Sequence, residues 1–516
     1  MNLASMFDES AYRFPDKIVL RYGARHYSYA EIRALSLRAA AVLQDQGVGA
    51  GDRVALMCFN TPYFLVGVLA ALRLGAVFVP VNHKLQAPEV EHILQHSRAG
   101  VCIVDGVLAP VMRKVRGTVR WLATDSAIEG APLFESLVEA AAPRALPAPC
   151  EREAVAQILY TSGTTGQPKG CVHSHRNVYT TAMIAALGLE ITRHERMLIA
   201  MPIWHASPLN NWMFGTLLMG GSLVFLREYS PRGMLETIAR EQTTLLFAAP
   251  IALLAPIDAV PDFNAFDLRS MRAWIYGGGP LGKDMALRLM DAYGSDQFIQ
   301  VYGMTEAGPL GTVLFPEDAL RKAGSIGRSS LPGVRVRVVD PDGRDTASGH
   351  IGEIVLQSEA AMQGYLDAPE ATAAAYDAQG WYHSGDLARV DQDGYFYVVD
   401  RLKDLIVTGG ENVYSKEVED ALSPHPDIAD VAVIGQPHAQ WGETVVAVIV
   451  ARPGRAPSDE DLKAFLADRL ARYKIPRLYR RVEALPRTPS GKLQKHILRE
   501  QMTAGIVPDQ GAKSDE

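Results

Sequence analysis

The sequence predicts an α/β fold built from more than one domain. Through the first half of the chain, short apolar runs bounded by glycine or proline alternate with segments of helical periodicity. This alternation is typical of strands joined by helical crossovers in a mostly parallel sheet. At 516 residues, the chain is also longer than a single hydrophobic core organises, so two or more domains are expected.

The N-terminal segment is predicted to form a hairpin and then a helix. Residues 18–22 and 25–27 read as two strands around a turn at Gly23. Ser28 and Glu31 have the spacing of a capping box, so a helix is expected from there to about residue 46. Further strands are expected at 54–58, 77–81 and 101–104, with helices that begin at Pro62 and Pro88.

The most apolar run, residues 64–81, is about as long as a membrane-spanning helix. It contains Arg73 and Gly75, and at Gly75 its composition changes from helix-forming residues to Val-Phe-Val-Pro-Val. We therefore predict a buried helix followed by a buried strand, and no membrane span.

A second α/β run follows a linker at 141–149 that is rich in alanine and proline. The linker leads into an apolar strand that ends at Tyr160, and later strands are expected near 197–200, 222–226, 244–248 and 271–276. Past Gly324, short β segments at 334–339, 352–357 and 395–398 are separated by glycine-containing turns. These segments predict a small antiparallel or barrel-like region.

A charged break at 400–404 precedes a shorter α/β unit. Helices are expected at 417–422 and 458–470, and strands at 428–434 and 445–450. Ser458 is the predicted N-cap of the second helix, whose first turn carries two acidic residues. The unit is predicted to be a separate domain.

Composition and charge indicate a cytoplasmic protein that binds neither nucleic acid nor an anionic membrane. The net charge is −7, with no basic cluster that would attract phosphate backbones or lipid headgroups. The four cysteines are widely separated and form no metal-ligand or disulfide pattern, which suits a reducing compartment. Residues 1–14 lack the basic and apolar regions of a secretory signal.

The stretch at 160–170 has the composition of a phosphate-binding loop. It reads Tyr-Thr-Ser-Gly-Thr-Thr-Gly-Gln-Pro-Lys-Gly. Glycines let backbone N–H groups face an anion, the hydroxyls add donors, and Lys169 supplies a positive charge. The P-loop template requires Gly-Lys-Ser/Thr after four intervening residues, whereas Lys169 lies between Pro168 and Gly170. A kinase-type or GTPase-type nucleotide fold is therefore disfavoured.

Five further motifs follow in order along the chain. They are Pro-Ile-Trp-His at 202–205, Gly-Gly-Gly-Pro at 277–280, Tyr-Gly-Met-Thr-Glu at 302–306, Tyr-His-Ser-Gly-Asp-Leu at 382–387, and Pro-Arg-Thr-Pro-Ser-Gly-Lys at 486–492. Together with the loop, these motifs resemble those of the adenylate-forming superfamily, which includes acyl-CoA synthetases, aryl-CoA ligases, peptide-synthetase adenylation domains and beetle luciferases. The resemblance extends over about residues 12–498.

The resemblance implies an architecture and a reaction. A large N-terminal domain, residues 1–402, would contain two α/β subdomains and a β-barrel-like subdomain. A small mobile α+β domain, residues 403–516, would follow the hinge residue Lys403. In the first half-reaction a carboxylate attacks ATP bound with Mg²⁺, giving an acyl-adenylate and pyrophosphate. In the second, the thiol of coenzyme A attacks the acyl-adenylate and AMP leaves, after the small domain has rotated.

The resemblance also assigns roles to individual residues. The catalytic residues would be Lys492, Thr305, Glu306 and His205. The nucleotide and coenzyme A would contact Thr161, Ser162, Gly163, Thr164, Thr165, Lys169, Gly278, Gly279, Pro280, Tyr302, Gly303, Asp386, Arg401, Gly409, Gly410 and Trp441. The acid pocket would include His205, Asn210, Trp212, Gly277 and Met304, and the metal would be held by Thr161 and Glu306.

Residue chemistry supports several of these roles. A lysine such as Lys492 can stabilise negative charge on the α-phosphate, and the carboxylate of Asp386 can accept two ribose hydroxyl groups. Glu306 offers the oxygen ligands that Mg²⁺ prefers. One departure from the family pattern is Ser415, at a position where many members have proline. This difference affects the stiffness of the backbone and removes no catalytic group.

The acid and the acceptor remain open in the sequence. A medium-chain or fatty acid is favoured, with an aryl or aryl-alkanoic acid as the alternative. Asn210 and Asn211 could reach a polar substituent of the acid, or could cap the helix that carries Trp212. Free coenzyme A is favoured as acceptor because no carrier domain follows residue 500. A carrier protein in trans and a homodimer are further partners left open.

Overall fold

The computed structural model describes residues 2–161, 168–438, 440–487 and 493–503. Over these residues it is a mixed α/β structure with four sheets, as expected. The chain divides into two compact units. Unit 1 comprises Met1–Arg337, Val355–Ser384 and Asp393–Phe396, and unit 2 comprises Val338–Ile354, Gly385–Gln392 and Tyr397–Glu516. The expected boundary between residues 402 and 403 concerns a moving domain and stays a prediction.

Unit 1 contains an eight-stranded sheet whose central strands are parallel. In spatial order its strands are β14 (Val313–Leu314), β13 (Phe298–Val301), β12 (Ala273–Gly277), β11 (Leu245–Ala248), β9 (Arg196–Ile199), β10 (Ser222–Phe225), β1 (Ile18–Tyr22) and β2 (Arg25–Ser28). The pairs from β13 through to β1 are parallel, and the two edge pairs are antiparallel. The hairpin at Gly23 and the strands after residue 195 are thus confirmed.

Unit 1 also contains a seven-stranded sheet, which carries the glycine-rich stretch. Its strands, in spatial order, are β17 (Gly364–Tyr365), β8 (Lys169–Ser174), β7 (Val155–Thr161), β4 (Val77–Pro80), β3 (Arg53–Met57), β5 (Ala99–Asp105) and β6 (Arg120–Thr124). The strands from β7 to β6 are parallel, whereas β8 and β17 are added antiparallel at one edge.

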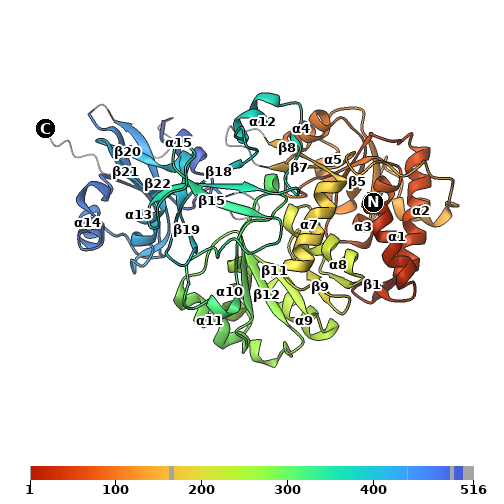
Figure 1. Cartoon of the computed structure of the whole chain (residues 1–516), viewed down its shortest axis with the longest axis horizontal. Helices are drawn as coiled ribbons and strands as arrows, with labels where there is room; N and C mark the ends of the chain where they lie inside the picture. Colours follow the sequence, from red (N-terminus) through yellow and green to blue (C-terminus); the bar gives the residue numbers. More distant parts are fainter. Residues whose placement is uncertain (1, 162–167, 439, 488–492, 504–516) are drawn as a thin grey trace. The chain divides into compact units, whose positions relative to one another are not determined.

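The helices of unit 1 follow the sequence pattern closely. They are α1 (Leu3–Arg13), α2 (Tyr29–Asp45), α3 (Pro62–Arg73), α4 (Ala87–Ser97), α5 (Ala109–Met112), α6 (Phe134–Ala140), α7 (His175–Gly188), α8 (Phe214–Met219), α9 (Pro231–Glu241), α10 (Pro250–Ala259), α11 (Lys283–Tyr293) and α12 (Pro369–Ala375) (Figure 1). The capping box of Ser28 and Glu31 is present at the start of α2. The apolar run forms α3, every residue of which is buried, and then β4. Among the described residues, no helix combines the length and apolar character needed to cross a membrane.

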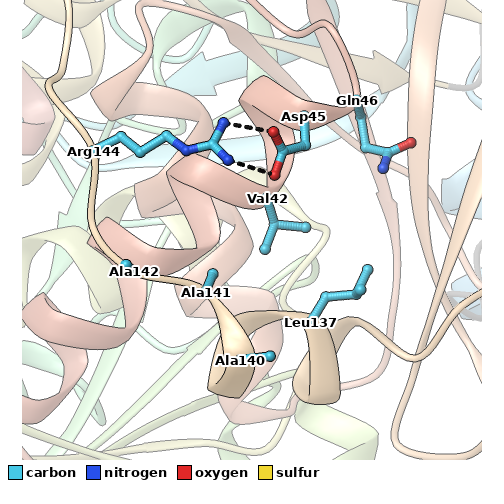
Figure 2. Close-up of a pocket in the computed structure, with 8 residues that line it drawn as sticks. All are labelled: Val42, Asp45, Gln46, Leu137, Ala140, Ala141, Ala142 and Arg144. Atoms are coloured by element: carbon cyan, nitrogen blue, oxygen red, sulfur yellow. Dashed lines mark hydrogen bonds and ion pairs between the residues drawn. The ribbon is translucent and has the colours of Figure 1, made fainter.

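Sheet membership differs from the order along the chain. The N-terminal hairpin, β1 and β2, belongs to the eight-stranded sheet with the later strands, because β1 pairs with β10. Conversely β7, which follows the linker, pairs with β4 and belongs with the earlier strands. The linker therefore does not separate two sheets. Its first residues lie beside α2, where the Arg144 guanidinium pairs with Asp45 (Figure 2).

That linker contact borders a surface cavity of about 370 Å³. Its lining residues are Val42, Asp45, Gln46, Leu137, Ala140, Ala141, Ala142 and Arg144. None of the residues assigned to the predicted site lines it.

A four-stranded sheet has the strand order β15 (Arg335–Val339), β16 (Ile351–Gln357), β18 (Tyr382–Val390) and β19 (Phe396–Arg401). Its residues are divided between the two units. The Asp-Gly turns predicted here are confirmed, with positive φ at Gly343 and Gly394.

The remainder of unit 2 is built on a five-stranded sheet. Its strands are β21 (Glu411–Val413), β20 (Ile406–Thr408), β23 (Gly442–Ala451) and β22 (Ile428–His438), with β24 (Leu478–Arg481) beside β23. The helices are α13 (Ser415–Leu422), α14 (Asp459–Ala467) and α15 (Lys495–Thr503). Ser458 caps α14, as expected. The core of this region includes Ile449, Leu462 and Tyr479, each at most 1% exposed.

Candidate active site

The glycine-rich stretch joins two antiparallel strands, β7 and β8. Thr161, the last residue of β7, is the register partner of Lys169, the first residue of β8. The hairpin therefore places a hydroxyl and an ammonium group at the same end of the strand pair. Ser162, Gly163, Thr164 and Thr165 lie outside the described residues.

Glu306 lies close to this hairpin. It belongs to the short 3₁₀ helix Thr305–Ala307, for which Met304 is the N-cap. One carboxylate oxygen, Oε1, lies 3.5 Å from the Thr161 Oγ1 atom and 3.3 Å from the Tyr365 Oη atom. The structure thus brings together the two residues that were expected to hold the metal, Thr161 and Glu306.

The chain around Tyr302 and Gly303 folds back tightly on itself. The Tyr302 N–H donates to the Thr312 carbonyl at 3.0 Å. A Cβ atom at Gly303 would lie 2.6 Å from the Pro309 carbonyl carbon, so a side chain there would displace the backbone. The glycine is required by this close approach, which fixes the start of the segment that carries Glu306.

The Gly-Gly-Gly-Pro motif begins at the carboxyl end of β12. Gly277 is the last residue of the strand, and a Cβ atom there would lie 2.8 Å from the Val301 carbonyl oxygen. Gly278 has φ of +88°, and a Cβ atom at Gly278 or Gly279 would meet nothing within 4 Å. Gly277 is therefore required by close packing, whereas Gly278 and Gly279 leave the chain after β12 open to the approach of a flat group, as expected at a nucleotide or acyl site.

His205 precedes a π-helix that spans Ser207–Met213. The His205 ring lies 3.7 Å, centroid to centroid, from the ring of Trp204. The π-helix carries Asn210 and Trp212, both at most 1% exposed, and the Trp212 ring stacks on Phe247 at 5.5 Å. Helical segments of this wide type are frequent at functional sites.

The two asparagines of the π-helix have different environments. Asn211 Nδ2 donates to the Pro309 carbonyl at 3.0 Å, whereas neither amide atom of Asn210 has a protein partner. The N-cap of the segment is Ala206, with no side-chain capping bond. The alternative in which the asparagines cap this helix is therefore excluded.

Phe247 connects Trp212 to the glycine motif. Its Cε2 atom lies 3.2 Å from where a Gly277 Cβ atom would be. His205, Asn210, Trp212 and Gly277 are thus linked by chain continuity and ring contacts within unit 1. They are four of the five residues assigned to the acid pocket, and that assignment stays a prediction.

In unit 2, Asp386 on β18 pairs with Arg401 at the end of β19. The Arg401 Nε atom lies 3.0 Å from the Asp386 Oδ1 atom, and the Asp386 side chain is 8% exposed. The adjacent strands β18 and β19 hold the two residues at this separation. The structure therefore brings together Asp386, which was assigned to the ribose, and Arg401, which was assigned to nucleotide or coenzyme A binding.

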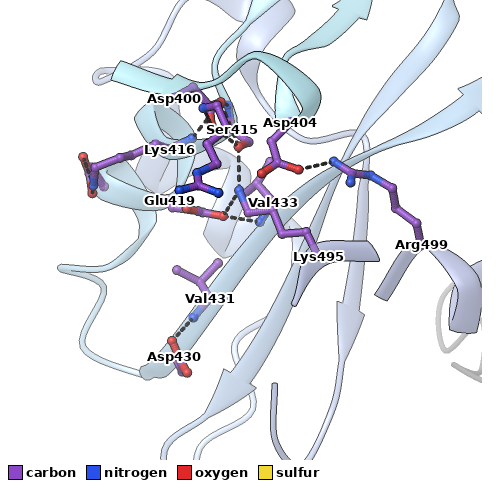
Figure 3. Close-up of polar contacts among 12 residues, drawn as sticks. Asp400, Asp404, Ser415, Lys416, Glu419, Asp430, Val431, Val433, Lys495 and Arg499 are labelled. Atoms are coloured by element: carbon purple, nitrogen blue, oxygen red, sulfur yellow. Dashed lines mark hydrogen bonds and ion pairs between the residues drawn. The ribbon is translucent and has the colours of Figure 1, made fainter. Parts of the chain in front are cut away.

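A polar network ties the segment before the expected hinge to the C-terminal helix. The Asp400 carboxylate accepts from the Ser415 N–H and from Ser415 Oγ at 2.8 Å. Lys495 Nζ lies 2.5 Å from Ser415 Oγ and 2.7 Å from Glu419 Oε1 (Figure 3). Ser415 is fully buried. A proline at 415 could not donate its N–H to Asp400, so the departure from the family pattern creates these bonds.

Two titratable groups beside this network are shifted by burial. Burial raises the pKa of the Glu419 carboxyl, and the nearby Lys495 opposes that shift. Burial lowers the pKa of the Lys403 ammonium, which lies in the 3₁₀ helix Leu402–Asp404. Lys492, the expected catalytic lysine, lies outside the described residues.

Gly409, Gly410 and Trp441 also lie in unit 2. Both glycines have positive φ, and the Gly409 N–H donates to the Trp441 carbonyl at 2.8 Å. A Cβ atom at Gly409 would lie 3.0 Å from the Trp441 Cε3 atom. The Trp441 ring is 37% exposed and lies 4.4 Å from the Arg477 guanidinium, an arrangement suited to stacking a nucleotide base.

The donors available to a metal are oxygen atoms. No group of three or more His, Cys, Asp or Glu side chains that could hold a metal occurs among the described residues. Mg²⁺ usually binds one or two protein carboxylates together with substrate phosphates and water. Glu306 and Thr161 fit such a site.

Sequence reasoning missed Tyr365, which contacts Glu306 and lies next to Lys169. It belongs to the two-residue strand β17, which is too short to show a periodic pattern. It also missed the hydrogen bonds between Asp400 and Ser415, because a contact between residues in different elements leaves no local pattern in the sequence.

Comparisons with known proteins show similarity over most of the chain. The family model "AMP-binding enzyme" matches residues 7–366, and the model "AMP-binding enzyme C-terminal domain" matches residues 417–492. Long-chain-fatty-acid–CoA ligase FadD13 of Mycobacterium tuberculosis is 38% identical over 487 residues, which cover 93% of this chain and 94% of the relative. Feruloyl-CoA synthase of an Amycolatopsis species is 38% identical over 485 residues, covering 94% and 96%.

A solved structure is similar over nearly the whole chain. It is o-succinylbenzoate coenzyme A synthetase from Bacillus subtilis in complex with ATP and magnesium ion, with a TM-score of 0.86 and 30% identity, covering 96% of this chain and 99% of that one. These matches define the class: the chain belongs to the adenylate-forming, AMP-binding enzyme family. Within that family it falls in the acyl-CoA synthetase branch, whose members are AMP-forming acid–thiol ligases.

Proposed function

We propose that this protein joins a carboxylic acid to coenzyme A through an acyl-adenylate. The observation that carries the proposal is the contact of Glu306 with Thr161, two family-motif residues 145 positions apart in the sequence. Family membership over both matched regions supports it. We further propose a cytoplasmic location and a role in fatty acid metabolism.

In the first half-reaction, a carboxylate oxygen attacks the α-phosphorus of ATP and pyrophosphate leaves. Lys169 and the hydroxyl groups of the loop bind the β- and γ-phosphates, and Asp386 with Arg401 binds the ribose. Glu306 and Thr161 would hold Mg²⁺, which would stabilise the negative charge of the phosphate oxygens when bound. Lys492 and Thr305 stabilise the negative charge that develops on the α-phosphate.

In the second half-reaction, the thiol of coenzyme A attacks the carbonyl carbon of the acyl-adenylate and AMP leaves. Trp441 and Arg477 provide a stacking face and a positive charge for the nucleotide portion of coenzyme A. Gly409 keeps the space beside Trp441 free of a side chain. An adenylating enzyme that loads a separate carrier protein is the competing function, and product identity separates the two.

The acid is proposed to be a medium-chain or fatty acid, which suits the apolar Trp212 and Phe247. One observation favours a second candidate, an aryl or aryl-alkanoic acid with a polar substituent. Asn210 is fully buried and has no protein partner for either amide atom. A buried amide without a partner costs about 1–3 kcal/mol, so a hydrogen-bonding group on the substrate would restore what burial costs.

A panel of acids tests the proposed function. Pyrophosphate release is measured with medium-chain, long-chain, cinnamic-type and phenylalkanoic acids, with and without coenzyme A, and products are identified by mass spectrometry. We expect acid-dependent pyrophosphate release and an acyl-CoA thioester. Acid-dependent pyrophosphate without any thioester would move the assignment to the carrier-loading function, and no release with any acid would contradict adenylation.

Replacing Asn210 with leucine tests the second candidate. Because the amide would bond a polar substituent, we expect kcat/KM for a hydroxyl-bearing aryl acid to fall about 5- to 100-fold. The matched acid without the hydroxyl should be unaffected or improved. Thermal denaturation should show no loss of stability, because the leucine removes an unpartnered amide. An equal change for both acids would contradict a substrate-recognition role for Asn210.

A further inference from the structure

Tyr365 lies between two residues to which the proposed function gives separate tasks. Its strand, β17, pairs antiparallel with β8, and Tyr365 is the register partner of Cys171. The next residue, Leu366, donates its N–H to the Gly170 carbonyl at 2.8 Å. This pairing fixes Tyr365 alongside the first residues of β8, which begins at Lys169.

The hydroxyl and the ring of Tyr365 contact groups of opposite charge. Its hydroxyl donates to the Glu306 Oε1 atom at 3.3 Å, and its ring centroid lies 5.0 Å from the Lys169 Nζ atom. The same Glu306 oxygen also lies 3.5 Å from Thr161 Oγ1. One side chain therefore contacts the proposed metal carboxylate and the proposed phosphate-binding lysine.

These contacts have distinct physical consequences. A hydroxyl that donates to a carboxylate fixes the orientation of that carboxylate, and such supporting bonds tune metal affinity. A ring beside an ammonium group attracts it through the negative potential of the ring face and limits its positions.

We propose that Tyr365 is a positioning residue with two tasks. Its hydroxyl orients the Glu306 carboxylate for binding Mg²⁺, and its ring orients the Lys169 ammonium group for binding phosphate. The proposal rests on the proposed function, since both tasks belong to ATP binding. If so, different substitutions at Tyr365 should affect Mg²⁺ binding and phosphate binding separately. Phenylalanine removes the hydroxyl and retains the ring, whereas leucine removes both.

The test measures equilibrium ATP binding by titration calorimetry, with and without Mg²⁺, in the absence of a carboxylic acid so that no turnover occurs. Tyr365→Phe should raise the half-saturating Mg²⁺ concentration for ATP binding about 10- to 100-fold, leaving Mg²⁺-free ATP binding unchanged. Tyr365→Leu should show the same Mg²⁺ defect and also weaken Mg²⁺-free ATP binding about two- to fivefold.

Tyr376→Phe is the matched control. Tyr376 is a neighbouring tyrosine whose hydroxyl donates to the Met362 carbonyl at 3.2 Å, so its substitution also removes one hydroxyl bond. It should leave both measurements unchanged. Thermal denaturation of all variants checks that each is folded.

The outcomes distinguish this role from the proposed function. If the wild-type chain binds ATP with Mg²⁺ but Tyr365→Phe leaves its Mg²⁺ dependence unchanged, the positioning role is wrong and the proposed function stands. An equal Mg²⁺ defect in Tyr376→Phe would also overturn the role, since any lost hydroxyl would then suffice. A wild-type chain that binds no ATP would overturn the proposed function and this inference together.

Discussion

Replacing Lys492 with alanine should slow acyl-adenylate formation about 100- to 1,000-fold, the usual effect of removing a group that stabilises transition-state charge. Attack on the α-phosphate concentrates negative charge, and the ammonium group is proposed to neutralise it. Thioester formation from supplied acyl-adenylate should remain close to the wild-type rate, because the thiol attacks the carbonyl carbon and the small domain that carries Lys492 is expected to have rotated before that step. Single-turnover measurements of each half-reaction provide both rates.

Lys463→Ala is the control for this substitution. Lys463 is an exposed lysine on α14, in the same unit, with no assigned role. Its removal changes the net charge equally and should change neither half-reaction. Equal loss of both halves in Lys492→Ala would contradict an adenylation-specific role for that lysine.

Replacing Gly409 with leucine should have the opposite effect on the two halves. The side chain would begin 3.0 Å from the Trp441 Cε3 atom and would occupy the space proposed for the thiol arm of coenzyme A. Displacement of a reacting group by about 1 Å can cost about 100-fold in rate, and we expect at least that loss in thioester formation. Adenylation should be retained, which pyrophosphate release in the absence of coenzyme A measures.

Backbone strain must be separated from blockage in this experiment. Gly409 has φ of +60°, where any L-residue is strained. Gly454→Leu places the same side chain at φ of +74° in unit 2, at an exposed position with nothing within 4 Å of its Cβ. This control should lose stability without losing thioester formation. Full turnover with coenzyme A in Gly409→Leu would contradict the proposed position of the coenzyme A thiol arm.

Local elements of the fold could be predicted well because their signals lie within a few residues. The capping box of Ser28 and Glu31, the N-cap at Ser458 and the buried helix–strand pair around Gly75 are confirmed. Each depends on spacing or composition over one or two turns of chain. The positive-φ glycines of the Asp-Gly turns depend on two adjacent residues.

Long-range strand pairing could not be predicted in the same way. The hairpin at Gly23 joins β10, about 200 residues later, and β7 joins the strands that precede the linker. The sequence of an apolar strand does not specify its partner in a parallel sheet, because many apolar strands could pair with it equally well. Order along the chain therefore does not show which strands become neighbours.

In the candidate site, too, local patterns could be predicted and long-range contacts could not. Motif residues such as Glu306 and Asp386 could be found because their neighbours in the sequence form recognisable patterns. Tyr365, Ser415 and Asp400 act through contacts between distant segments, and their local sequence is ordinary. The π-helix around Asn210 was also unexpected, because its residues suit an α-helix equally well.

The most direct test of the proposed acyl-adenylate is the fate of oxygen from the acid. A substrate labelled with ¹⁸O in both carboxylate oxygens is converted to the thioester, and AMP and pyrophosphate are analysed by mass spectrometry. Attack of the carboxylate on the α-phosphorus, followed by thiol attack on the carbonyl carbon, transfers a single ¹⁸O to AMP and none to pyrophosphate. Thioester formation that yields unlabelled AMP, or ADP with labelled phosphate, would contradict an acyl-adenylate.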